Sequence, residues 1–153
     1  MKTTNSSPLR FALVGCGRIA PKHVDALTSG AVPGARLVAV CDIIVERAQA
    51  IANKHPGVQA FKSARGMMES LGAGIDVVTV LTPSGLHARH TVELARFGKH
   101  IVVEKPMALT LQDADTMVQA CDAAGVRLFV VKQNRYNHPV KKLRQALEAG
   151  RFG

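Results

Sequence analysis

The sequence has 153 residues, of which 47% are hydrophobic and 20% are charged, and these proportions suit one globular domain with a buried core. The formal net charge is +9, but the basic residues are scattered and aromatic residues make up only 4%, which disfavours nucleic-acid binding and favours an anionic cofactor or substrate. No apolar run approaches the roughly 20 residues of a membrane span, and we expect residues 1–7 to be a disordered tail without an export signal.

The first predicted element is an apolar strand at 11–14 that runs into Gly15-Cys16-Gly17-Arg18-Ile19-Ala20 and a helix over 19–29. Strand, glycine turn and helix in this order are typical of a dinucleotide-binding loop. Gly15 permits the tight turn, Gly17 leaves the backbone open to a pyrophosphate, and Ala20 allows close helix packing. The free N–H groups of the helix N-terminus would face the phosphates. The predicted cofactor-binding residues of this loop are Gly15, Gly17, Arg18 and Ile19.

The next predicted strand, 36–41, ends at Asp42. A carboxylate at this place can accept hydrogen bonds from the adenosine ribose hydroxyls, and it repels a 2′-phosphate. Asp42 therefore predicts NAD as the cofactor rather than NADP, although Arg36 and Arg47 lie nearby in the sequence. The alternative is that Asp42 caps the helix predicted from Ile44, and both roles are compatible.

A strand at 76–81 runs into the loop Thr82-Pro83-Ser84-Gly85-Leu86-His87, which opens a helix over 88–97. His87 and His90 have the i, i+3 spacing of a helical metal pair, but no third ligand lies beside them, so we predict no metal site. We expect His87 to cap or pack at the head of its helix, close to the cofactor.

The strand at 100–103 ends at Glu104-Lys105-Pro106. A lysine at the rim of a buried sheet is expected to be poorly solvated, and burial favours the neutral amine that general acid–base chemistry needs. Pro106 restricts Lys105 to an extended backbone, which would fix its direction. The alternative is a surface lysine paired with Glu104.

Together the apolar segments predict an α/β fold of the Rossmann type, with six parallel strands and helices on both faces. The expected strand order is 3-2-1-4-5-6, with the ligand across the carboxyl ends. We expect residues 8–131 to form the dinucleotide-binding domain and 132–153 to lead to a second domain outside this sequence. The predicted strands are 11–14, 36–41, 58–61, 76–81, 100–103 and 127–131; the predicted helices are 19–29, 44–54, 64–71, 88–97, 111–124 and 139–149.

Three cysteines, Cys16, Cys41 and Cys121, are odd in number and not closely spaced. This pattern argues against a disulfide framework or a zinc site and fits the reducing cytoplasm. Cys16 lies ahead of a predicted helix N-terminus, which can lower the pKa of a thiol. The alternative is that Cys16 is simply a small residue in a tight loop.

The glycine loop, Asp42, the segment 82–87 and Glu104-Lys105-Pro106 together resemble the glucose–fructose oxidoreductase, inositol dehydrogenase and MocA (Gfo/Idh/MocA) family. Many members have Asn where Ser84 stands. The resemblance implies NAD(P)-dependent oxidation of a sugar or polyol hydroxyl, with Lys105 as the catalytic residue and a Lys105–Pro106 bond that is often cis. The further cofactor contacts that it implies are Thr82, Pro83, Ser84, His87, Glu104, Lys105 and Gln133.

The exit segment 132–137 and the ending 150–153 most resemble the branch that oxidises the 3-hydroxyl of UDP-N-acetylglucosaminuronate in bacterial surface-polysaccharide synthesis. The family's second domain, an open antiparallel sheet with a catalytic histidine, would make the full-length protein a homo-oligomer. Two other classes of function remain open at this stage. A methyltransferase also uses a glycine loop and an acidic residue, but it has no role for Glu104-Lys105-Pro106. A non-catalytic NAD-sensing protein of the same fold has no need of Lys105.

Overall fold

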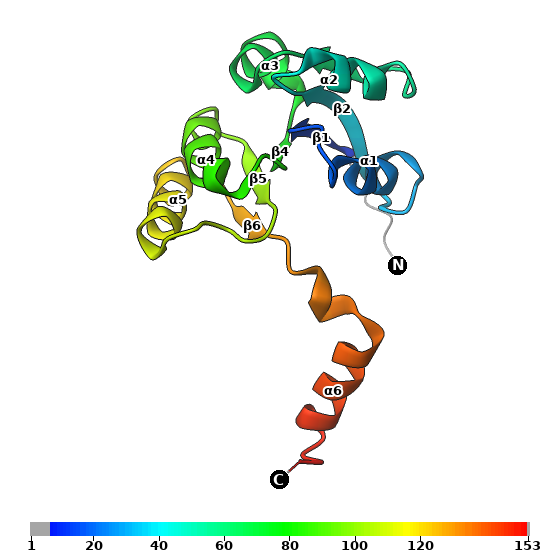
Figure 1. The fold of residues 1–153 in the computed structure, drawn as a ribbon, viewed down its shortest axis with the longest axis vertical. Coiled ribbons are helices and arrows are strands. Elements are labelled where there is room, and N and C mark those ends of the chain that lie inside the picture. Colours follow the sequence, from blue (N-terminus) through cyan, green and yellow to red (C-terminus); the bar gives the residue numbers. More distant parts are fainter. Residues whose placement is uncertain (1–6, 153) are drawn as a thin grey trace.

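The computed structural model describes residues 7–152, and its centre is a six-stranded parallel sheet with the strand order β3-β2-β1-β4-β5-β6 (Figure 1). This order confirms the prediction. The inner strands are apolar on both sides because helices cover both faces of the sheet. The strands are β1 Leu9–Val14, β2 Ala35–Cys41, β3 Gln59–Phe61, β4 Val77–Val80, β5 His100–Val103 and β6 Leu128–Val130.

Helices alternate with the strands along the chain, and their ends lie within about two residues of the predicted ones. The largest local difference is at the loop after β4, where the α-helix begins at His87 and is preceded by a 3₁₀ turn over Ser84–Leu86. The α-helices are α1 Ala20–Thr28, α2 Val45–Ala52, α3 Ala64–Leu71, α4 His87–Ala95, α5 Leu111–Ala123 and α6 His138–Glu148.

Two apolar layers separate the sheet from its helices. On one face, Ala20 and Val24 of α1 and Ala48 of α2 pack with Leu13 and Val40 of the sheet. The opposite face is larger and takes its buried side chains from α3, α4 and α5. Its fully buried members include Met67, Leu94, Ile101 and Met117. The carboxyl ends of the strands, where the predicted site residues lie, therefore rest on a packed core.

The amino edge of the sheet is held by an ion pair between the first residues of β1 and the segment before β4. Arg10 donates from Nη2 to Asp76 Oδ1 at 2.7 Å and from Nε to Oδ2 at 2.9 Å, and its backbone N–H donates to Oδ2 at 2.8 Å. The hydrogen bonds from Arg10 lower the pKa of Asp76 to about 2. This pair joins the two halves of the sheet at the end away from the predicted site.

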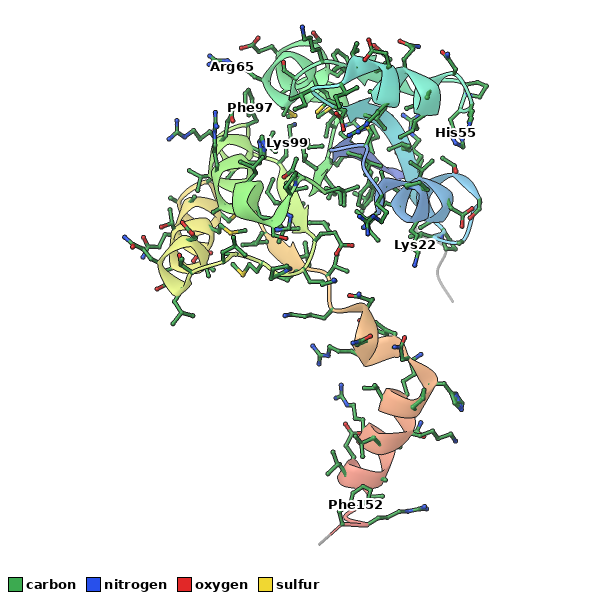
Figure 2. All side chains as sticks on the ribbon, viewed as in Figure 1. Lys22, His55, Arg65, Phe97, Lys99 and Phe152 are labelled. Atoms are coloured by element: carbon green, nitrogen blue, oxygen red, sulfur yellow. The ribbon has the colours of Figure 1, made fainter. Side chains whose placement is uncertain are left out.

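Helix α6 projects away from the sheet and its covering helices (Figure 1), and none of its residues is buried within the described part of the chain. A 3₁₀ turn, Gln133–Tyr136, lies between β6 and this helix. Figure 2 shows side chains arranged around α6, with Phe152 at its far end. Of the predicted tail 1–7, only Ser7 falls among the described residues. No helix among residues 7–152 combines the length and apolarity that crossing a bilayer requires.

Candidate cofactor and acid–base site

The glycine turn brings the end of β1 against the end of β4. Gly15 has a φ of +102°, and a Cβ at this position would lie 2.9 Å from the backbone carbon of Leu81. Its N–H donates to the carbonyl oxygen of Cys41 at 2.8 Å. A side chain at Gly15 would thus be strained by its own backbone and would collide with a neighbouring strand. A Cβ on Gly17 would meet no atom within 4 Å, so the backbone there is open to a ligand group.

Asp42 ties the glycine turn to the end of β2. Its Oδ2 accepts the N–H of Cys16 and its Oδ1 accepts the N–H of Ile44, both at 2.8 Å, and the residue is 9% exposed. Each carboxylate oxygen retains a lone pair for another donor. Helix α2 begins at Val45, with Ile44 as its N-cap residue and no side-chain capping bond, so Asp42 does not cap the helix in the predicted way. Its role toward the ribose stays a prediction.

Cys16 is not an activated thiol. Burial, and secondarily the negative charge of Asp42, raises the pKa of Cys16 to about 12. Burial likewise raises the pKa of Cys41 to about 12. The possibility of a lowered pKa at Cys16 was therefore wrong, because loss of solvation and a nearby carboxylate outweigh the helix terminus. The structure favours the alternative, a small residue in a tight loop.

A cleft of about 640 Å³ opens along the carboxyl ends of β1, β2 and β4. The exposed side chain of Ile43 and the ring of His90 also line it, and neither was among the predicted cofactor residues. An apolar residue directly after the acidic end of the second strand is a signal that could have identified Ile43. The predicted residues that meet in this cleft are Gly15, Gly17, Arg18, Ile19, Asp42, Thr82, Pro83 and Ser84.

Four other predicted residues, His87, Glu104, Lys105 and Gln133, do not line this cleft in the described chain. His87 is 1% exposed and lies beneath the loop. Its Nδ1 is 2.8 Å from the carbonyl oxygen of Pro106, and its Nε2 is 2.8 Å from that of Thr82. The structure thus places His87 at the head of α4, as predicted, but both ring nitrogens face backbone oxygens instead of the cleft. Gln133 lies in the exposed 3₁₀ turn after β6.

The segment after β5 presents an exposed Lys105 beside a nearly buried Glu104, which is 8% exposed. Glu104 Oε1 lies 2.9 Å from Nε2 of His23, and Oε2 accepts the backbone N–H of Lys105 at 3.0 Å. The predicted poor solvation of Lys105 is therefore wrong for this chain, because Lys105 follows the end of β5 and is exposed. The alternative pairing of Lys105 with Glu104 is not observed either, since His23 takes that carboxylate. The Lys105–Pro106 bond is cis.

Residues 7–152 contain no group of three His, Cys, Asp or Glu side chains arranged to hold a metal ion. His90 has a buried Nδ1 without a hydrogen-bond partner in the described chain, and burial lowers the pKa of its ring. His87 and His90 therefore lie in different surroundings, although they are three residues apart on α4.

A doubly wound parallel sheet with a glycine turn, an acidic residue after the second strand and a cleft at its carboxyl edge defines a dinucleotide-binding Rossmann domain. The open space at Gly17 and the free acceptor capacity of Asp42 fit a dinucleotide.

Residues 9–132 match the family described as the oxidoreductase family with an NAD-binding Rossmann fold, Gfo/Idh/MocA. The chain belongs to this family, which confirms the resemblance and the predicted cofactor, and which argues against a methyltransferase.

Two similar solved structures are WlbA dehydrogenases in complex with NADH and UDP-GlcNAcA. The protein from Bordetella pertussis is 44% identical, with a TM-score of 0.88 over 96% of this chain and 41% of that chain. The protein from Chromobacterium violaceum is 41% identical, with a TM-score of 0.89 over 97% of this chain and 42% of that chain. D-apiose dehydrogenase from Paraburkholderia graminis is 34% identical over 99% of this chain and 39% of its own length. The chain thus spans about two fifths of these relatives.

Proposed function

We propose that this chain is the NAD-binding part of a dehydrogenase that oxidises the 3-hydroxyl of a UDP-linked N-acetylaminouronate. The observation that carries this proposal is the similarity to two WlbA dehydrogenases whose structures contain NADH and UDP-GlcNAcA, at 44% and 41% identity. The similarity covers 96% and 97% of the present chain. Relatives that act on other polyols, such as D-apiose dehydrogenase at 34%, are less similar in sequence.

Bound NAD would supply a hydride acceptor. The chain's part in binding begins at the glycine turn, where Gly17 leaves room for the pyrophosphate. The first N–H groups of α1 are not free as expected, because Ala20 donates to Gly17, Lys22 donates to Ile19 and Pro21 has no N–H. The helix would therefore act on the phosphates through the positive end of its dipole. Asp42 is held by two backbone N–H groups, so its carboxylate has a fixed position from which to accept ribose hydroxyls. A 2′-phosphate would bring a second negative charge against this nearly buried group, and this favours NAD over NADP.

Lys105 is the proposed acid–base residue. It follows β5 at the same edge of the sheet as the glycine turn, and its exposed amine is free to reach a substrate hydroxyl. In the oxidation, the neutral amine takes the hydroxyl proton as the C–H bond yields its hydride, and the ammonium returns the proton in the reverse direction. A guanidinium stays protonated, so arginine cannot replace lysine in this role.

The test uses the full-length protein in single-turnover mixtures with NAD, so that NADH is detected whether or not it leaves the protein. UDP-N-acetylglucosaminuronate is compared with myo-inositol and D-apiose, and the product is examined by mass spectrometry. We expect NADH and loss of two hydrogens with the nucleotide sugar alone. Preferential oxidation of myo-inositol or D-apiose would overturn the proposed substrate. NAD binding without NADH from any of the three would favour the non-catalytic alternative.

A further inference from the structure

We propose that His23 and His87 are positioning residues that hold the segment Glu104–Pro106 from two sides and thereby place Lys105 relative to the two cofactor loops. The inference rests on the proposed acid–base role of Lys105. Neither histidine lines the cofactor cleft. They act through the backbone on either side of the Lys105 amide.

The first contact with the segment Glu104–Pro106 comes from α1. The ring of His23 contacts Glu104 Oε1 at 2.9 Å, with side-chain exposures of 21% for His23 and 10% for Glu104. The other oxygen of Glu104 accepts the N–H of Lys105 at 3.0 Å. One carboxylate therefore joins the phosphate-facing helix to the backbone of Lys105. Because both oxygens are used in a poorly solvated place, loss of the His23 donor would leave a nearly buried charge without its partner.

The second contact with this segment comes from α4. His87 lies between the carbonyl oxygens of Pro106 and Thr82, at 2.8 Å from each. Thr82 opens the loop that lines the cofactor cleft, and Pro106 follows Lys105 directly. The buried ring thus spans the two loops. A neutral imidazole donates to one of the two oxygens, and only an imidazolium donates to both.

These two contacts matter for function because the Lys105 side chain makes no ion pair or hydrogen bond within residues 7–152. The placement of the amine therefore depends on the Lys105 backbone. Lysine has a flexible four-carbon stem, and the backbone determines where that stem begins. A displacement of about 1 Å in a reacting group can lower the rate on the order of 10²-fold. Loosening Glu104–Pro106 is therefore expected to reduce kcat more than NAD binding.

The main test compares His23→Leu, which removes the donor, with His23→Gln, whose amide nitrogen can take the place of Nε2. In the full-length protein with UDP-N-acetylglucosaminuronate, we expect His23→Leu to lower kcat roughly 10- to 100-fold, while the Kd for NAD and the KM stay within about threefold. His23→Gln should restore most of kcat. His55→Leu is the matched control, because His55 (labelled in Figure 2) makes no side-chain hydrogen bond among the described residues. Unchanged kcat in His23→Leu, or no restoration by glutamine, would overturn the role of His23.

At His87 the two amide substitutions separate the two ring contacts. The amide nitrogen of His87→Asn can take the place of Nδ1 and donate to Pro106, whereas that of His87→Gln can take the place of Nε2 and donate to Thr82. If His87 positions Lys105, the asparagine variant retains several-fold more kcat than the glutamine variant at matched thermal stability. Equal kcat in two folded variants would contradict this role. If both variants fail to fold, the role of His87 is tested by the crystal structure of the NAD-bound wild-type protein, where loss of either ring contact would overturn it.

A substrate-free measurement separates failure of this inference from failure of the proposed function. The full-length protein, saturated with NAD, is treated with a trace of acetic anhydride, and acetylation of each lysine is measured by mass spectrometry. We expect His23→Leu to change the labelling rate of Lys105 several-fold relative to Lys54, which is exposed at the far end of α2. If wild-type protein oxidises no nucleotide sugar, the proposed substrate falls, while an altered Lys105 rate still supports the positioning. An unaltered acetylation rate of Lys105 in His23→Leu would overturn the positioning role of His23.

Discussion

The two halves of the sheet's carboxyl edge are organised by different means. At the ends of β1 and β2, the backbone itself does the work: Gly15 donates to Cys41 across the strands, and Asp42 accepts two nearby N–H groups. At the ends of β4 and β5, the loops are held by side chains from other elements, His23 on α1 and His87 on α4. The cofactor half is therefore held by contacts between the ends of adjacent strands, and the proposed acid–base half also depends on side chains from helices that pack beside the sheet.

The chemistry proposed for each half explains this difference. Binding a dinucleotide needs backbone N–H groups and one carboxylate in fixed places, and short segments can provide both. An acid–base lysine needs its amine to reach a second molecule, so it stays exposed and is aimed by its surroundings. Substitutions in the first half should therefore change affinity or folding, and substitutions in the second half should change turnover.

The largest effect is expected from removing the amine in the acid–base half. Lys105→Met in the full-length protein should lower kcat roughly 10²- to 10⁴-fold, because general acid–base help is lost. The NAD affinity, measured by calorimetry, should stay close to that of the wild type. Lys105→Arg should fail equally although it keeps the charge. A variant with near-normal kcat across the pH range would make Lys105 a structural residue.

In the cofactor half, the two glycines of the turn separate folding from binding. Gly15→Ala should destabilise the protein by about 1–3 kcal/mol, because its φ is +102° and its Cβ would lie 2.9 Å from the Leu81 backbone. Gly17→Ala should melt near the wild-type temperature but bind NAD roughly 10-fold more weakly, a loss of about 1.4 kcal/mol, because its Cβ enters the space for the pyrophosphate. Thermal unfolding and calorimetry measure the two effects. Normal NAD affinity in Gly17→Ala would contradict the proposal that the pyrophosphate lies against Gly17.

A smaller effect on cofactor choice is expected at Asp42. In Asp42→Asn, one backbone N–H would face an amide NH₂ instead of a carboxylate oxygen, and the charge that repels a 2′-phosphate is gone. We expect the preference for NAD over NADP to narrow by about 10-fold, which corresponds to about 1.4 kcal/mol. Titration of both cofactors measures it, with Asp25→Asn, an exposed change on α1, as the control. An unchanged ratio would assign discrimination to other residues.

The smallest effect is expected from the amino edge of the sheet, where neither half of the site is touched. The pKa of Asp76 is lowered from 3.8 to about 2, so the folded state gains stability from this carboxylate above pH 4 and loses it progressively as the pH falls toward 2. Both side chains are about one third exposed, at 33% for Arg10 and 30% for Asp76, so screening limits the gain to a few degrees in Tm. Arg10→Leu should lower Tm at pH 7 and have less effect near pH 2. An equal loss at both pH values would assign the change to packing.

The same division explains what could be predicted from the sequence. All six strands were predictable because buried parallel strands are short apolar runs bounded by turns, as in Val77–Val80. Gly15 and Asp42 were predictable because their partners lie at the ends of adjacent strands. His23 was not, since its contact with Glu104 joins residues 81 positions apart and depends on how α1 lies over the sheet. The exposure of Lys105 was missed because the apolar strand before it says nothing about the direction of a side chain past the rim.

The pairing of β1 with β4 also bears on how the polypeptide becomes a sheet during synthesis. β1 pairs with β2 and with β4, but β4 begins at Val77 and therefore leaves the ribosome after β1, β2 and β3. Until then one side of β1 is an open edge of unpaired N–H and C=O groups, and such an edge is a template for pairing with other chains. Released chains that end at Gly74 should accordingly aggregate more readily than released chains that end at Val130, as sedimentation would show, and equal behaviour would contradict this. β1, which lies between β2 and β4 in the complete sheet, is thus an edge strand until β4 has been made.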